Sequence, residues 1–195
     1  MTAKKVLAVL GHPDSESFNA AIFHAYVEAA TAAGHEVRTL ELGALDFDPV
    51  LRFGYRARMA PDPVIERSQA WLLWAEHIAL VFPVWWSQMP ALLKGWADRT
   101  FMPGFAYNMK DDGLRAIGHL RGRTGTIITT SQAPRWGLAL AGLSPVWNIK
   151  RNLFGTCGIK TTRTLSLGRM TTRHDTAERR ARFLQKVAQA GRAIG

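Results

Sequence analysis

Short apolar runs alternate with longer amphipathic stretches along the chain. The apolar runs contain β-branched residues and end at glycines or polar clusters, which is typical of strands buried on both faces of a sheet. We predict five such strands, at residues 5–10, 37–42, 78–82, 126–130 and 160–167. Prolines and glycines break the pattern at residues 43–63, which we expect to form a long surface excursion.

The amphipathic stretches predict helices that follow the strands. In the first of them, Phe18, Ile22, Tyr26 and Ala29 share one face, and Gly34 is suited to end the helix. Helices are predicted at residues 19–33, 64–76, 91–99 and 145–154. The segment after the third of these, through residue 112, contains glycine and proline and is predicted to be a loop.

A final helix is predicted near the end of the chain. Asp175 and Glu178 have the spacing of a capping box, with Asp175 as the N-cap residue. Phe183, Val187 and Ile194 then line the face of this helix that packs on the core.

Strands that alternate with helices predict an α/β fold with a parallel sheet covered on both faces. Five strands without an internal repeat suit one doubly wound, flavodoxin-like domain over residues 1–195, with strand order 2-1-3-4-5. Ligands of such sheets bind outside the carboxyl ends of the strands, where the strand order reverses. This rule selects the segments 11–19, 83–90 and 129–136.

Composition narrows the class of protein. Hydrophobic residues make up 47% and charged residues 21% of the chain, which is ordinary for a globular protein. No apolar run approaches the roughly 20 residues of a membrane span, and the apolar start is better explained as a buried strand than as a signal peptide. A single cysteine, Cys157, excludes an intrachain disulfide framework and favours a cytoplasmic location.

The net charge of +10 is compatible with nucleic acid, an anionic membrane or an anionic small molecule as partner. The basic residues are spread along the chain, however, so a solvated basic surface is the simpler interpretation. Nucleic-acid binding would rest on net charge alone and is not expected.

The first selected loop carries Ser15, Ser17 and Asn19 at a helix start. Free backbone N–H groups and the helix dipole make such a start suitable for a phosphate, although these residue types are also common as simple helix caps. Neither a GxGxxG nor a GxxxxGK[ST] motif is present, which argues against a Rossmann dinucleotide site and a P-loop. His12, Asp14 and Ser17 lie on one turn without a nucleophile elbow, and the histidines lack metal-ligand spacing.

The other two selected segments differ in character. Trp85 and Trp86 lie between two prolines and could form a stacking wall for a planar ring, or be buried in the core. Residues 129–132 (TTSQ) could hydrogen-bond the edge of such a ligand, or simply end the strand. Together the three segments favour a planar aromatic cofactor that carries a phosphate.

The stretches "HPDSESFNAAI", "FPVWWSQMPALLKGWADRTFMPGFAY" and "TT" after the fourth strand resemble the NAD(P)H:quinone reductase family of flavodoxin-like flavoproteins. The resemblance covers most of the first 135 residues. It implies a homodimeric enzyme that binds FMN or FAD, accepts a hydride from NADH or NADPH and passes two electrons to a quinone or a similar small aromatic acceptor, with ping-pong kinetics. The absence of a C-terminal extension that would hold an adenine favours FMN.

The resemblance also assigns roles to residues. Those assigned to the flavin are His12, Ser17, Phe18 and Asn19 at the phosphate, Pro83, Val84, Trp85 and Trp86 along the ring, and Thr129, Thr130 and Ser131 at its polar edge. Those assigned to the catalytic pocket, with Trp85, are Trp86, Trp136 and Tyr107, the last in the family often across a dimer interface. No side-chain nucleophile is required, because the flavin carries the chemistry.

Two departures from the family pattern bear on the acceptor. The loop after the fourth strand reads TTSQAPRWGLALAG, where the family usually has TTGG followed by a tyrosine and a histidine, and Ser87 replaces an aromatic residue. Both changes weaken the assignment of quinone as the acceptor. The alternative is a flavodoxin-fold ancillary subunit of a membrane transporter with little catalytic role, whose basic surface could dock an acidic partner or a membrane face.

Overall fold

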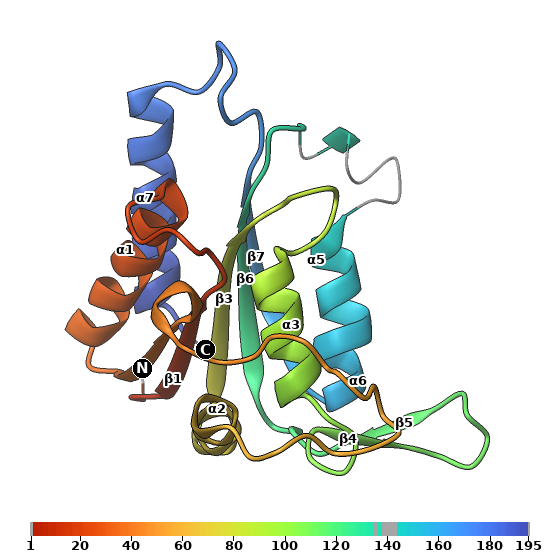
Figure 1. Ribbon diagram of the computed structural model, residues 1–195. Helices are drawn as coiled ribbons and strands as arrows, with labels where there is room; N and C mark the ends of the chain where they lie inside the picture. The colour runs from red at the N-terminus through yellow and green to blue at the C-terminus, as the bar shows by residue number, and fades with distance from the viewer. Residues whose placement is uncertain (1, 135, 138–143, 195) are drawn as a thin grey trace.

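The protein is described by a computed structural model over residues 2–134, 136–137 and 144–194 (Figure 1). Its main sheet has five parallel strands in the order β2-β1-β3-β6-β7, which is the predicted order 2-1-3-4-5 with the strands numbered along the chain. The predicted doubly wound, flavodoxin-like α/β fold is confirmed.

The strands match the apolar runs to within two residues at each end. Their bounds are Lys5–Leu10 for β1, Glu36–Glu41 for β2, His77–Pro83 for β3, Thr124–Thr130 for β6 and Lys160–Leu167 for β7. β3 is buried along its whole length, as expected for a central strand covered on both faces. β2 and β7, at the two edges, are partly exposed.

Two layers of helices cover the sheet (Figure 1). α1 (Phe18–Ala32) and α7 (Ala177–Arg192) pack on one face, where Tyr26, Phe23 and Val187 are buried. On the other face lie α2 (Pro63–Trp74), α3 (Ala91–Thr100) and the helical run of α5, η2 and α6 (Pro145–Asn148, Ile149–Phe154, Gly155–Cys157). No helix in the described residues is long and apolar enough to cross a membrane.

The start of α7 differs from the prediction. Thr176, not Asp175, is the N-cap, and its side chain accepts a hydrogen bond from the Arg179 N–H at 3.3 Å. The Asp175 carboxylate instead accepts from Arg180 Nε and Nη2 at 2.9 and 2.7 Å and from the Thr171 N–H at 2.8 Å. Both residue types are good caps, so the tertiary pairing with Arg180 decides which of them caps the helix.

The predicted loop after α3 contains two short strands that sequence patterning did not identify. β4 (Tyr107–Met109) and β5 (Ala116–Gly118) form an antiparallel pair at the end of the molecule where α2 lies (Figure 1). Three-residue strands are too short to produce a periodic signal. This pair therefore lies at the end of the molecule where the main strands begin, away from their carboxyl ends.

The predicted excursion at residues 43–63 begins with a short turn of 3₁₀ helix (Leu42–Ala44) and is otherwise irregular. It is fixed to α3 by the buried Arg99, which donates to the Asp48 carbonyl and lies 3.8 Å from the Asp62 carboxylate. Gly95 allows the close approach, since a Cβ atom there would overlap Pro49.

A buried histidine lies at the start of β3. His77 is 1% exposed, and its two ring nitrogens are hydrogen-bonded to the hydroxyls of Thr124 and Thr126 at 2.7 and 3.0 Å. Burial, with the nearby charges of His35, Arg163 and Lys4, lowers the pKa of His77 to about 4. The imidazole is therefore neutral in the folded protein at neutral pH.

We predict that His77 makes the protein less stable in mild acid. Between pH 6.5 and 4 the unfolded chain binds a proton at this histidine and the folded chain does not, so the free energy of unfolding falls with pH by about 3 kcal/mol. Urea unfolding of His77→Gln between pH 7 and pH 4 should show a smaller decrease than wild type. His174→Gln, at an exposed histidine, is the matched control and should keep the wild-type slope. Equal slopes for His77→Gln and wild type would contradict the prediction.

Candidate functional site

A cavity of about 690 Å³ opens at the carboxyl ends of the strands, among the segments that follow β1, β3, β6 and β7. Ten of the eleven predicted cofactor-binding residues line it: His12, Ser17, Phe18, Asn19, Pro83, Val84, Trp85, Trp86, Thr130 and Ser131. The three segments selected from the sequence are thus brought to one site. Gln132 also lines the cavity.

The start of α1 forms one wall. Ser17 is the N-cap, and its hydroxyl accepts from the Ala20 N–H at 3.2 Å, so it caps the helix. The N–H groups of Phe18 and Asn19 lie in the first turn, where a helix supplies no acceptor. Asn19 is buried and hydrogen-bonded to the Thr130 hydroxyl, with Nδ2 to Oγ1 at 3.0 Å, which joins the first wall to the third.

The tryptophan pair lies in a tight turn. Trp85 and Gln88 exchange backbone hydrogen bonds of 3.0 and 2.9 Å, and both central residues have positive φ, 50° at Trp86 and 60° at Ser87. This is the pattern of a type I′ turn, which favours asparagine and glycine rather than tryptophan and serine. Trp85 is 44% exposed and Trp86 is fully exposed, so neither belongs to the core. The ring of Trp85 makes an edge contact with that of His12.

Backbone strain is concentrated around this cavity. In the described part of the chain, four residues other than glycine have positive φ, namely Trp86, Ser87, Arg169 and Thr171. The first two are in the turn after β3 and the other two are in the segment between β7 and α7; three of the four line the cavity. Each such residue costs on the order of 1–3 kcal/mol, and residues of this kind cluster at functional sites.

Sequence reasoning missed the fourth wall. Met170, Thr171 and Arg180 line the cavity from the segment after β7 and from α7. The Arg180 guanidinium lies over the ring of Phe18 at 4.9 Å and holds the pKa of Asp175 at about 2. The rule that selected the other three segments applies equally to the carboxyl end of β7 and was the available signal.

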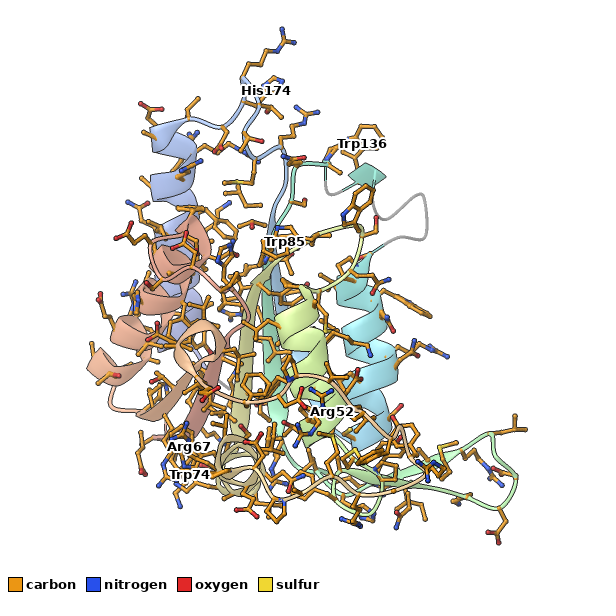
Figure 2. All side chains as sticks on the ribbon, in the orientation of Figure 1. Arg52, Arg67, Trp74, Trp85, Trp136 and His174 are labelled. Atoms are coloured by element: carbon orange, nitrogen blue, oxygen red, sulfur yellow. The ribbon has the colours of Figure 1, made fainter. Side chains whose placement is uncertain are left out.

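The remaining predicted residues lie elsewhere. Thr129 is buried and paired with the Ser166 hydroxyl at 2.9 Å, outside the cavity lining. Trp136 is 63% exposed and lies at the same end of the molecule as Trp85 (Figure 2), but it does not line the cavity. Tyr107 is in β4, which lies at the end of the molecule opposite the cavity (Figure 1). Within the segment between β6 and α5, residues 135 and 138–143 lie outside the described residues.

The described residues show neither a metal site nor a reactive cysteine. They contain no group of three or more histidine, cysteine, aspartate or glutamate side chains that could hold a metal ion. Cys157 is buried, and burial raises the pKa of its thiol to about 12, so the thiolate is scarce at neutral pH.

We predict that the turn at residues 85–88 lowers the free energy of unfolding. Replacing Trp86 by Asn and Ser87 by Gly puts residues that accept positive φ at both positions and should raise the free energy of unfolding by about 1 kcal/mol. Urea denaturation at neutral pH measures the change. Trp147→Asn, which replaces another exposed tryptophan in ordinary helical backbone, should produce no gain. A turn variant no more stable than wild type would show that the turn is not strained.

Comparisons with known proteins agree with this architecture. A family model described as "Flavodoxin-like fold" matches residues 4–190. Smu.1420 of Streptococcus mutans, a solved structure, is 34% identical, with a TM-score of 0.80 over 97% of this chain and 100% of that one.

Two curated relatives have names that state an activity. NAD(P)H dehydrogenase [quinone] 1 of Rattus norvegicus is 33% identical over 129 residues, 55% of this chain and 46% of the relative. Ribosyldihydronicotinamide dehydrogenase [quinone] of the same species is 25% identical over 186 residues, 82% of this chain and 79% of the relative. This chain spans about half the length of the first curated relatives that it matches. The match over residues 4–190 shows that the chain belongs to the family described as flavodoxin-like fold.

Proposed function

We propose that the protein is a flavin-dependent oxidoreductase that transfers a hydride from NAD(P)H, by way of bound FMN or FAD, to a quinone or similar small aromatic acceptor. The observation that carries the proposal is the cavity at the strand ends. It combines a helix start, an exposed tryptophan turn and a polar strand end in about 690 Å³. The names of the two rat relatives support the same activity.

The residues present fit a flavin phosphate. The N–H groups of Phe18 and Asn19 and the positive end of the α1 dipole face the cavity region, with the charged Arg180 beside Phe18. No aspartate or glutamate is among the described residues that line the cavity. The Asp175 carboxylate lies next to the lining, because it is bound to Arg180 and to Thr171 N, and it offsets part of the charge of Arg180.

The residues also fit a planar ring. Trp85 and Trp86 present aromatic surface that the core does not use, and Pro83 and Val84 continue this wall towards β3. Thr130 and Ser131 line the cavity beside Pro83 and Val84, since Val84 N donates to the Thr130 carbonyl at 2.7 Å. The Thr130 hydroxyl already pairs with Asn19, and the Ser131 hydroxyl donates to the Ala133 carbonyl. Thr129 is not part of the proposed ring site, since its hydroxyl is engaged with Ser166.

A bound flavin would supply the chemistry of accepting and then donating a hydride. The chain itself would hold the phosphate at α1, fix the plane of the ring against Trp85, and leave the open side beside Trp86 for the co-substrates. Nicotinamide donor and aromatic acceptor would occupy that side in turn, which corresponds to ping-pong kinetics.

We further propose that the active unit is a homodimer. The excursion and the β4–β5 pair expose apolar side chains, among them Tyr55, Met109 and Leu114, and Trp147 of α5 is exposed as well. Exposed apolar residues that gather on neighbouring segments are typical of a subunit interface. Tyr107 lies at the end of the molecule away from the cavity of its own chain, and pairing of two copies would give it a route to the partner's cavity.

The flavin assignment is tested by the bound chromophore and by one cap residue. The purified protein should absorb near about 450 nm, and mass spectrometry of the released chromophore should identify FMN or FAD. Ser17→Ala should weaken flavin binding about tenfold, because a hydroxyl donor at the phosphate is lost, and should reduce stability by about 1 kcal/mol. Asp62→Ala, which removes the cap of α2 at the other end of the molecule, should reduce stability and leave flavin affinity unchanged. A colourless protein that takes up no added flavin would end the proposal.

The dimer assignment is tested at the tip of the β4–β5 pair. Leu114 is 88% exposed, and Leu114→Glu should convert the dimer to a monomer in light scattering, because a charge at an apolar interface is costly. The monomer should keep its flavin and lose most NADPH–menadione turnover. Tyr107→Phe should leave the dimer intact and raise KM for menadione more than it lowers kcat. A wild-type monomer with full turnover would contradict the homodimer.

A further inference from the structure

A second cavity, of about 510 Å³, lies between the outer strand β7 and helix α7. Its lining comes from residues 164–167 of β7 and from Arg179, Arg182, Phe183 and Lys186 of α7, and none of these lines the candidate flavin site. β7 is the last strand in the sheet order, so one of its edges has no neighbouring strand in the sheet. We call this cavity the β7–α7 groove.

The groove carries concentrated positive charge. Arg179, Arg182 and Lys186 have the spacing i, i+3 and i+7, which puts their side chains along one face of α7. No acidic residue is among the described residues that line the groove. Glu178 is the nearest acid in sequence, but its carboxylate is fully exposed, and the interactions that lower its pKa are mainly local hydrogen bonds rather than the charge of Arg182.

Only one of the two terminal nitrogens of the Arg179 guanidinium has a hydrogen-bond partner among the described residues. Its Nη2 donates to the Gly168 carbonyl at 2.6 Å, whereas its Nη1 is buried and has no hydrogen-bond partner among the described residues. A buried guanidinium nitrogen without an acceptor is costly and is unusual in a folded protein. Arg179 also lines the groove, and a guanidinium matches phosphate oxygens geometrically.

We propose that the β7–α7 groove binds a small molecule that carries a phosphate or pyrophosphate group. Arg179 and Arg182 would provide planar donors and Lys186 a point charge, which together match an anion with several oxygens. The Ser166 hydroxyl is already paired with Thr129 and is not assigned to the ligand. The volume of the groove leaves room for an organic group attached to the phosphate. The proposal does not depend on flavin binding, because the two cavities share no residue.

Calorimetric titration with inorganic pyrophosphate tests the groove. The protein is first incubated with excess FMN so that any phosphate site at α1 is filled, and the titration is repeated without FMN. Wild type should bind one pyrophosphate in a saturable manner when FMN is present, and this binding should persist when FMN is left out. The double variant Arg182→Gln/Lys186→Gln should bind at least about tenfold more weakly, because two charge-assisted contacts are lost. Both positions are exposed, so the fold should be retained.

A matched variant separates the groove from net charge. Lys150→Gln/Arg192→Gln also removes one lysine and one arginine at exposed positions, and neither residue lines the groove. Its affinity for pyrophosphate should stay within about twofold of wild type, because screening makes distant surface charges weak. An equal loss in both double variants would show general charge attraction and overturn the proposal. The absence of saturable binding in wild type, or binding that FMN abolishes, would overturn it as well.

A phosphate group could also belong to a lipid, and a vesicle assay distinguishes this source. Wild type is mixed with phosphatidylcholine vesicles that contain, or lack, a phosphatidylinositol phosphate, and the bound fraction is measured by sedimentation. We expect no binding to either vesicle, since the groove is a recess sized for a soluble ligand. Binding to the anionic vesicles without binding of pyrophosphate would overturn the proposal of a small soluble ligand.

Discussion

The reversal of strand order between β1 and β3 is the constraint on which the site depends. The chain leaves β1 towards β2 on one side and returns to β3 on the other, and α1 and α3 follow β1 and β3 on opposite faces of the sheet. The two loops therefore diverge, and the space between them cannot be filled by either helix. The Asn19–Thr130 hydrogen bond joins the start of α1 to the end of β6 and so links the first wall of the cavity to the third. A cavity is thus a consequence of the topology, while its chemistry is a consequence of the loop residues.

Several of those loop residues adopt backbone conformations that their residue types disfavour. Asparagine and glycine would form the turn after β3 more easily than tryptophan and serine do, and the segment after β7 holds Arg169 and Thr171 at positive φ as well. Such strain persists only where the surroundings determine the backbone, as they do here: Trp85 and Gln88 close one turn, and Met170 N donates to the Ser131 carbonyl at the other. The strain holds an exposed indole at the cavity mouth, which stability alone would not favour.

The sheet and three of the four walls of the cavity could be predicted from the sequence, because they depend on patterns of five or more residues. Apolar runs locate the strands, and the switch-point rule then locates the segments after β1, β3 and β6. Other features depend on single tertiary contacts. Pairing with Arg180, for example, removes Asp175 from the cap of α7. Thr129 is a different case, since the alternation of side chains along β6 points it to the face opposite Thr130, where it meets Ser166. The position of Tyr107 illustrates a different limit, since a role across two chains has no signal in the geometry of one.

The distribution of basic charge follows from the periodicity of α7. Arg179 and Arg180 are adjacent in sequence, but successive helical residues point about 100° apart, so the two side chains serve different cavities. Arg180 is bound by Asp175 and covers Phe18, so part of its charge is neutralised where it lines the flavin site. Arg179 bonds only to a neutral carbonyl and has Arg182 and Lys186 beside it. A polyanion without an aromatic group should therefore be attracted to the groove more strongly than to the flavin site, whereas an aromatic phosphate finds its ring wall only beside Trp85.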